Sequence, residues 1–156
     1  SPAAKQFAKY YSNPHMFSNA LSPVQAAVAS EAIRIVRSAE GEELRGRLLS
    51  AVSALRDGFA AQGLECLGTP SPNVIVPIGD DRLARLASRR IAESGVFLDL
   101  VEYPAVPVEQ ARLRLQAKAT HEVAQVEEAV RRIIAARALA EEDLKLWRPP
   151  RQGTTI

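Results

Sequence analysis

The sequence predicts an α+β fold in which helices pack on a short, mainly antiparallel sheet. Apolar residues recur at helical spacing in the first part of the chain, and Gly- and Pro-rich turns separate short strands and helices after residue 63. The expected order from residue 23 onward is helix, helix, strand, helix, strand, strand, helix. This order is typical of helices packed on one small sheet, and 156 residues suffice for one such domain.

Two helices are expected in the first part of the chain. Residues 3–11 are expected to form a short helix that Ser12-Asn13-Pro14 ends, and residues 15–22 carry little periodicity. Pro23 then opens an Ala-rich helix that runs to about Arg37, because the first turn of a helix tolerates proline.

A third helix and a first strand lie on either side of a turn-rich connector. Apolar residues recur at helical spacing over residues 42–62, and Gly63 is expected to end this helix. After the connector of residues 68–72, residues 73–78 read as a short apolar strand. Pro77 has no N–H to give to a ladder, which predicts an edge strand or a strand end.

A capped helix, a second strand and a final amphipathic helix are expected after residue 79. Gly79-Asp80-Asp81 is expected to cap a helix that Gly95 closes, and residues 96–103 read as a second strand. An amphipathic helix is expected over residues 123–134, and residues 141–156 are expected to form a flexible tail.

The most informative segment is residues 112–118, where polar and apolar residues alternate ahead of a Thr-His pair. Read as a strand, it separates its apolar side chains from its polar ones, with Leu113, Leu115 and Ala117 on one face and Arg112, Arg114, Gln116 and Lys118 on the other. The apolar face predicts core. The polar face is either a solvated sheet face, the commoner case for charged residues, or an anion-binding wall.

Composition and charge exclude several classes of protein. The net charge is only +2 and the basic residues are scattered, so no nucleic-acid surface is expected. Cys66 is the only cysteine, and His15 and His121 lie far apart, so neither a disulfide framework nor a metal site is expected. No apolar run approaches the roughly 20 residues that cross a bilayer, and the first residues do not read as a signal peptide, which predicts a cytoplasmic protein.

No catalytic constellation is expected in this chain. It lacks a Gly-rich phosphate loop after a strand, a Gly-x-Ser-x-Gly elbow and a cysteine with a plausible histidine partner. Cys66 is expected to be a small core residue, and His121 a structural histidine between a strand and a helix. Acidic pairs fall at helix starts or on helix surfaces, where capping or solvation explains them: Glu42-Glu43, Asp80-Asp81, Glu127-Glu128 and Glu141-Glu142.

Seven short segments follow one another in a distinctive order: 17–23 (FSNALSP), 40–45 (EGEELR), 71–79 (SPNVIVPIG), 95–97 (GVF), 103–107 (YPAVP), 111–115 (ARLRL) and 119–121 (ATH). In this order they resemble the C-terminal part of the α-oxoamine synthases, over residues 5 to about 137. These fold-type I enzymes of aminotransferase class I/II use pyridoxal phosphate (PLP) to condense an amino acid with an acyl-CoA. The family includes 8-amino-7-oxononanoate synthase, 2-amino-3-ketobutyrate CoA ligase, 5-aminolevulinate synthase and serine palmitoyltransferase.

The resemblance implies the small C-terminal domain of such an enzyme and a role for three residues. Arg114, the second arginine of the Arg-Leu-Arg strand, would bind the substrate carboxylate, and a guanidinium on a strand offers the fork that a carboxylate needs. Ser18 and Asn19 match a segment near the dimer interface that holds the cofactor phosphate of the neighbouring subunit, although Asn19 stands where threonine is usual. Lys118 departs from the neutral residue common at its position.

The Schiff-base lysine of the family has no counterpart before Ser18. Lys5 and Lys9 lie in a helical setting and lack the Ser-Lys or Gly-Lys context of the family. The chain is therefore expected to be a fragment, with residues 1–22 an interface segment from the end of the large domain and residues 23–140 the small domain. Alone, it is expected to bind no PLP and to be inactive, whereas the complete enzyme is expected to be a homodimer.

Two alternatives stay open on the sequence alone. An aminotransferase would use the same arginine for its substrate carboxylate but would transfer nitrogen instead of an acyl group. A stand-alone interaction or small-ligand module would use the arginine row to bind an anionic partner. In the preferred interpretation, the complete enzyme acts on an amino acid and an acyl-CoA or acyl carrier.

Overall fold

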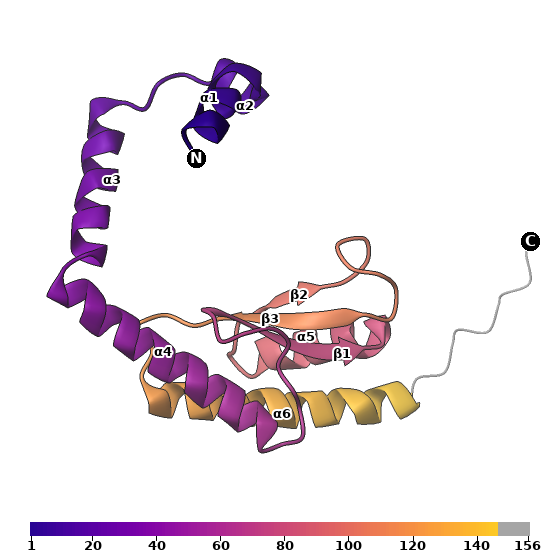
Figure 1. The fold of residues 1–156 in the computed structure, drawn as a ribbon. Coiled ribbons are helices and arrows are strands. Elements are labelled where there is room, and N and C mark those ends of the chain that lie inside the picture. Colours follow the sequence, from indigo (N-terminus) through magenta and orange to yellow (C-terminus); the bar gives the residue numbers. More distant parts are fainter. Residues whose placement is uncertain (147–156) are drawn as a thin grey trace, which may run out of the picture. The chain divides into compact units, whose positions relative to one another are not determined.

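The computed structural model describes residues 1–146, which divide into two compact units (Figure 1). The first unit is Ser1–Glu42, and the second begins at Glu43. The expected domain boundary after residue 22 therefore does not coincide with the boundary between the units. The assignment of residues 1–22 to an interface stays a prediction.

The first unit contains α1 (Pro2–Tyr11), α2 (Asn13–Met16) and α3 (Pro23–Val36). Helices α1 and α3 were expected, but α2 was not, because Pro14 starts a helical turn here and does not simply end one. At the start of α3, Ser22 and Gln25 each accept a hydrogen bond from the other's backbone N–H, at 3.2 and 3.1 Å. None of these three helices has a buried residue.

Helix α4 (Ala39–Ala60) starts earlier than the expected residue 42. A Cβ at Gly41 would collide with the backbone carbonyl oxygens of Ile35 and Val36 at the end of α3. Glycine therefore permits the tight turn from α3 into α4. The hydroxyl of Ser38 accepts from the N–H of Gly41 at 3.4 Å and so caps the new helix.

The second unit is built on three antiparallel strands in the order β1-β3-β2 (Figure 1). The central strand is β3 (Ala111–Gln116), with β1 (Asn73–Gly79) on one side and β2 (Asp99–Val101) on the other. The expected antiparallel sheet is confirmed, and Pro77 lies on an edge strand as predicted.

Segment 66–68 covers part of the outer edge of β1. The N–H of Leu67 donates to the carbonyl of Ile75 at 2.9 Å. Arg56 of α4 holds the segment in place, since its Nη2 donates to the carbonyls of Cys66 and Gly68 at 3.2 and 3.0 Å. The edge of β1 is therefore partly paired within the chain.

Strand β2 is shorter than the expected strand of residues 96–103. It begins only at Asp99, because the N–H of Val96 still donates to the carbonyl of Ile91 at the end of the preceding helix, at 3.2 Å. The chain must leave that helix before its backbone can pair with β3, and only residues 99–101 do so.

Two helices complete the core. Helix α5 (Asp81–Glu93) contacts all three strands, and α6 (Val123–Leu146) packs against α5. The expected burial of Leu113, Leu115 and Ala117 is confirmed, with exposures of 0, 7 and 6%. The largest core residues come from helices α4, α5 and α6 and from strands β1 and β3: Val52, Leu55, Phe59, Val74, Val76, Ile91, Leu113, Leu115, Val126, Val130 and Ile133.

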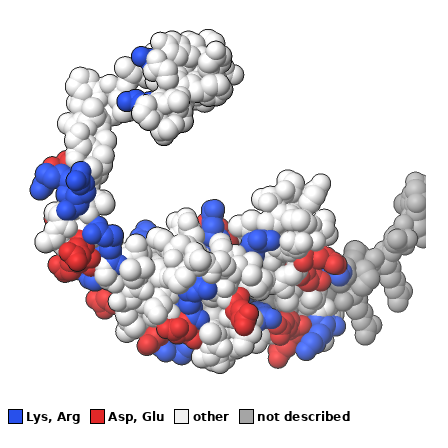
Figure 2. Space-filling view, in the orientation of Figure 1, with Lys and Arg blue, Asp and Glu red and all other residues white. Residues whose placement is uncertain are grey.

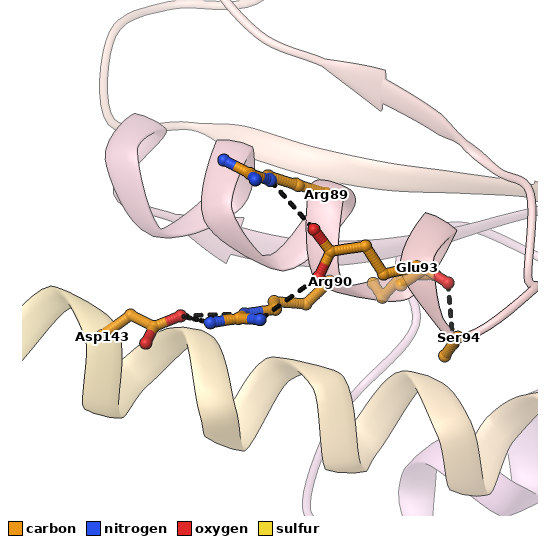
Figure 3. Close-up of polar contacts among 6 residues, drawn as sticks. Arg89, Arg90, Glu93, Ser94 and Asp143 are labelled. Carbon is orange, nitrogen blue, oxygen red and sulfur yellow. Dashed lines mark hydrogen bonds and ion pairs between the residues drawn. The ribbon is translucent and has the colours of Figure 1, made fainter.

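The expected tail was placed too early, because α6 continues through residues 141–146. Ala140, the residue just before this stretch, is fully buried. From α5, Arg90 donates through Nε and Nη2 to Oδ2 of Asp143, at 2.9 and 2.8 Å, and Figure 3 shows this pair between the two helices. The pair ties the end of α6 to α5. The rest of the expected tail, residues 147–156, lies outside the described residues.

Charged side chains of both signs are interspersed over the second unit on the face that Figure 2 shows. Within residues 1–146, no helix combines the length and the apolar character that crossing a membrane requires.

Asp143→Ala should lower the free energy of unfolding by up to about 1 kcal/mol, because Arg90 donates two hydrogen bonds to one oxygen of Asp143 but the two side chains are 42% and 34% exposed. Urea unfolding measures the change, and high salt should reduce it. Glu142→Ala removes an equal charge from an exposed neighbouring position and should change stability less. Equal effects of the two substitutions would show that the Arg90 pair does not hold the end of α6.

Candidate functional site

The polar face of the sheet carries the candidate anion-binding residue, Arg114. It sits on the central strand, opposite Ile75 of β1 and Asp99 of β2. Its side chain projects from the face opposite to the buried Leu113 and Leu115 and is 45% exposed. Two ladders therefore fix its backbone while its guanidinium reaches solvent.

The guanidinium of Arg114 binds the carboxylate of Asp99. Its Nε and Nη2 donate to Oδ2 of Asp99 at 3.1 and 2.8 Å. The Asp99 side chain is 53% exposed, so the pair lies at the surface. Asp99 was not predicted as a site residue, although it fell within an expected strand, because its pairing with Arg114 depends on a strand register that was not predicted.

Arg112 has separate partners. Its Nε donates to the carbonyl of Gln110 at 3.1 Å, and its Nη2 lies 3.5 Å from the side-chain oxygen of the same residue. The preceding residue, Glu109, has a φ of 61°, which is unfavourable for a non-glycine residue. Its N–H donates to Oδ2 of Asp81 at 3.1 Å, so α5 holds the loop that positions Gln110.

His121 closes the turn between β3 and α6. Its Nδ1 accepts from the N–H of Lys118 at 3.3 Å, and its own N–H donates to the Lys118 carbonyl at 3.1 Å. The structural role expected for this histidine fits these contacts. Together with Phe97, Gln116 and Arg132, it also lines a cavity of about 530 Å³.

Cys66 is a partly buried residue packed against the core. Burial raises the pKa of its thiol, and the positive charge of Arg56 opposes this shift only in part. A thiol of raised pKa carries little thiolate at neutral pH and is a poor nucleophile. Within residues 1–146, no group of three His, Cys, Asp or Glu side chains could hold a metal ion.

Asp80 caps α5 as predicted. Its Oδ1 accepts from the backbone N–H groups of Arg82 and Leu83 at 2.7 and 2.9 Å. These hydrogen bonds, that of Leu83 above all, lower the pKa of the Asp80 carboxyl. Since Asp81 holds the loop before β3, both members of this acidic pair have structural tasks.

The residues predicted to bind the cofactor phosphate lie in the first unit. Ser18 and Asn19 follow α2 in an exposed segment. The hydroxyl of Ser18 donates to the carbonyl of Pro14, so it must release that carbonyl before it can donate to phosphate. With this rearrangement, its O–H and the amide of Asn19 are donors of the kind that phosphate oxygens accept.

The comparisons with known proteins place this geometry in a family. Residues 1–133 match the family model of aminotransferase class I and II. The chain belongs to this family. A curated relative, 2-amino-3-ketobutyrate coenzyme A ligase of Escherichia coli (strain K12), is 33% identical over 119 residues, which are 76% of this chain and 29% of the relative. Another, 8-amino-7-oxononanoate synthase of Citrifermentans bemidjiense, is 34% identical over 114 residues, 73% of this chain and 29% of the relative.

Solved structures show the same relationship. Serine palmitoyltransferase from S. paucimobilis with a bound PLP-myriocin aldimine has a TM-score of 0.76 and 26% identity, covering 88% of this chain and 34% of that chain. These relatives are all α-oxoamine synthases, so the resemblance noted in the sequence and the expected fold are confirmed. The chain spans less than a third of the length of the curated relatives it matches.

Asp80→Ala should lower the free energy of unfolding by about 1 kcal/mol at neutral pH, because two N–H groups of α5 lose their acceptor. The pKa of Asp80 in the folded state lies below its ordinary value of 3.8, so this stabilisation is present above pH 3.8 and is lost as the pH falls through the folded-state pKa. Urea unfolding should therefore show that the difference in the free energy of unfolding between wild type and Asp80→Ala shrinks as the pH falls from about 7 to about 3.

Asp80→Asn is the matched control, since it keeps a capping oxygen without the charge. It should retain most of the stability and weaken the pH dependence. A gap between wild type and Asp80→Ala that stays constant over the whole pH range would contradict a role for the ionised carboxylate.

Proposed function

We propose that the chain is the C-terminal part of a PLP-dependent acyl-CoA:amino-acid C-acyltransferase. The observation that supports this most directly is the solvent-facing Arg114 on the central strand of a fold shared with α-oxoamine synthases. In the proposed reaction, a decarboxylative condensation, the amino acid loses carbon dioxide and its α-carbon joins the acyl carbon, which leaves its thiol carrier. The chain would contribute the residue that binds the substrate carboxylate.

The position of Arg114 suits carboxylate binding. Its Nε and Nη2 form a two-donor edge that already binds one carboxylate, that of Asp99. Arg112 also has an acceptor within the chain, the carbonyl of Gln110, so the choice between the two arginines rests on the family resemblance, which assigns the role to the second arginine of the strand. The two arginines also have different partners, Gln110 for Arg112 and Asp99 for Arg114, so their guanidinium groups do not converge on one anion in this structure. We therefore assign the role to Arg114 alone.

Ser18 and Asn19 would hold the phosphate of PLP through their O–H and N–H donors. When bound, PLP supplies the electron sink that carbanion chemistry at the α-carbon requires. The remainder of the cofactor site would come from the large domain, and the phosphate contact would serve the neighbouring subunit of a homodimer.

Exposed apolar side chains in the first unit support an interface at residues 1–22. They are more than half exposed and come from α1, α2 and the residue after α2: Phe7, Tyr10, Tyr11, Met16 and Phe17. Such clusters mark surfaces that another domain or chain covers. We assign this surface to the contact with the large domain or with a second subunit.

Acyl transfer is favoured over the other reaction of the family, amino transfer. One relative at 33% identity is named as a coenzyme A ligase, which supports an acyl-CoA as the second substrate. Both reactions need a carboxylate-binding arginine, so Arg114 does not distinguish them.

In the complete enzyme, Arg114→Ala should weaken amino-acid binding by about 2 to 5 kcal/mol, because a charge-assisted bidentate contact is lost. Titration with the amino acid, followed through the absorbance of bound PLP, measures the dissociation constant. Arg112→Ala is the control and should weaken binding much less. Equal affinities for wild type and Arg114→Ala would show that Arg114 does not bind the substrate and that the arginine row is a solvated sheet face.

The isolated chain should form no stoichiometric, borohydride-trapped adduct with PLP at a single lysine. Lys5 and Lys9 are exposed on α1, and Lys9 lies 5.9 Å from the ring centroid of Tyr10. Peptide mass spectrometry after reduction gives the extent of reaction at each site, with exposed Lys145 of α6 as the background level. A full adduct at Lys5 or Lys9 alone would refute the assignment of this chain as a part without the Schiff-base lysine.

A further inference from the structure

Asp99 occupies the edge of Arg114 that a substrate carboxylate needs. Both donors of that edge, Nε and Nη2, point to the same oxygen of Asp99. The register of β2 on β3 places the two residues directly opposite each other, so the sheet itself builds the pair. The candidate anion site is therefore filled by a carboxylate of the same chain.

We propose that Asp99 is a specificity-determining residue of this site, which competes with the substrate carboxylate for Arg114. The inference rests on the proposed function of Arg114. Substrate binding would then exchange one carboxylate for another on the same edge of the guanidinium. Asp99 would set how tightly a substrate carboxylate must bind Arg114 in order to displace it.

The exposure of the pair permits this exchange. The side chains of Arg114 and Asp99 are 45% and 53% exposed, and ion pairs in contact with solvent are held weakly. Asp99 is also the first residue of the three-residue strand β2, at the edge of the sheet. Its side chain can turn away without breaking the ladder on either side of Arg114.

A displaced Asp99 still acts on the substrate. Its backbone stays opposite Arg114, and the Cβ atoms of directly opposed residues lie only about 5 Å apart. Its negative charge therefore remains close to the bound carboxylate and repels it. The site should favour amino acids whose only negative group is the α-carboxylate, and it should disfavour dicarboxylic amino acids, which bring a second charge.

The test compares Asp99→Asn with Glu102→Gln in the complete enzyme. Glu102 is a carboxylate just after β2, but it pairs with Arg85 of α5, at 2.7 Å, and so serves as a control of equal charge. Titration with L-alanine and L-aspartate, followed through the absorbance of bound PLP, gives both dissociation constants. Asp99→Asn should tighten L-alanine binding at least about fivefold and L-aspartate binding more.

Glu102→Gln should change neither dissociation constant. Asp99→Glu keeps the negative charge, so both of its dissociation constants should stay close to those of the wild type. Unchanged or weaker L-alanine binding in Asp99→Asn, while Arg114→Ala still weakens it, would overturn the inference and leave the proposed function standing. If Arg114→Ala itself has no effect, the proposed function fails first.

A second measurement needs only the 156-residue chain. Heteronuclear NMR of the Arg114 Nε–H reports its exchange with water, which should be faster in Asp99→Asn because the acceptor at 3.1 Å loses its charge. Exchange should be unchanged in Glu102→Gln. Equal exchange in Asp99→Asn and wild type would show that the pair does not form, which overturns the inference whatever the enzyme does.

Discussion

The pairing of β3 on both of its sides is the constraint on which the second unit depends. Its backbone is bound to β1 and to β2, so the strand cannot shift by one residue without turning every side chain to the opposite face. In the observed register, Leu113 and Leu115 enter the core while Arg112 and Arg114 face solvent. A shifted register would bury guanidinium groups and expose leucines, which makes it strongly unfavourable. The same hydrogen bonds thus secure the core and aim the candidate binding residue.

Features that depend on neighbours in the sequence could be predicted from it. The alternation over residues 112–118 defines the two faces of β3, and the cap formed by Asp80 depends on N–H groups only two and three residues away. The pair of Asp99 with Arg114 could not be predicted, because it depends on the register of two strands joined by a long loop. The extent of α6 was missed for a similar reason, since Asp143 is held by a residue of another helix.

Arg114 and Ser18 differ in the packing that holds them. Arg114 belongs to a unit with its own hydrophobic core, so the packing of that unit can fix its direction. Ser18 belongs to a unit whose three helices α1 to α3 bury no residue, and its hydroxyl is turned to a neighbouring carbonyl. The backbone of Arg114 is thus fixed within this chain, and only the Asp99 side chain must move for a substrate carboxylate to bind. In the proposed enzyme, the phosphate contact would require both a rearrangement of Ser18 and a partner surface.

The edges of the small sheet have a consequence for the behaviour of the second unit in solution. An open edge with a long row of free N–H and C=O groups is a template for pairing with other chains. Here Leu67 already occupies part of the edge at Ile75, and Pro77 offers no N–H further along β1. On the opposite side, β2 offers only three residues. Each edge therefore offers only a short run of free backbone groups, which disfavours edge-to-edge pairing of this unit with other chains.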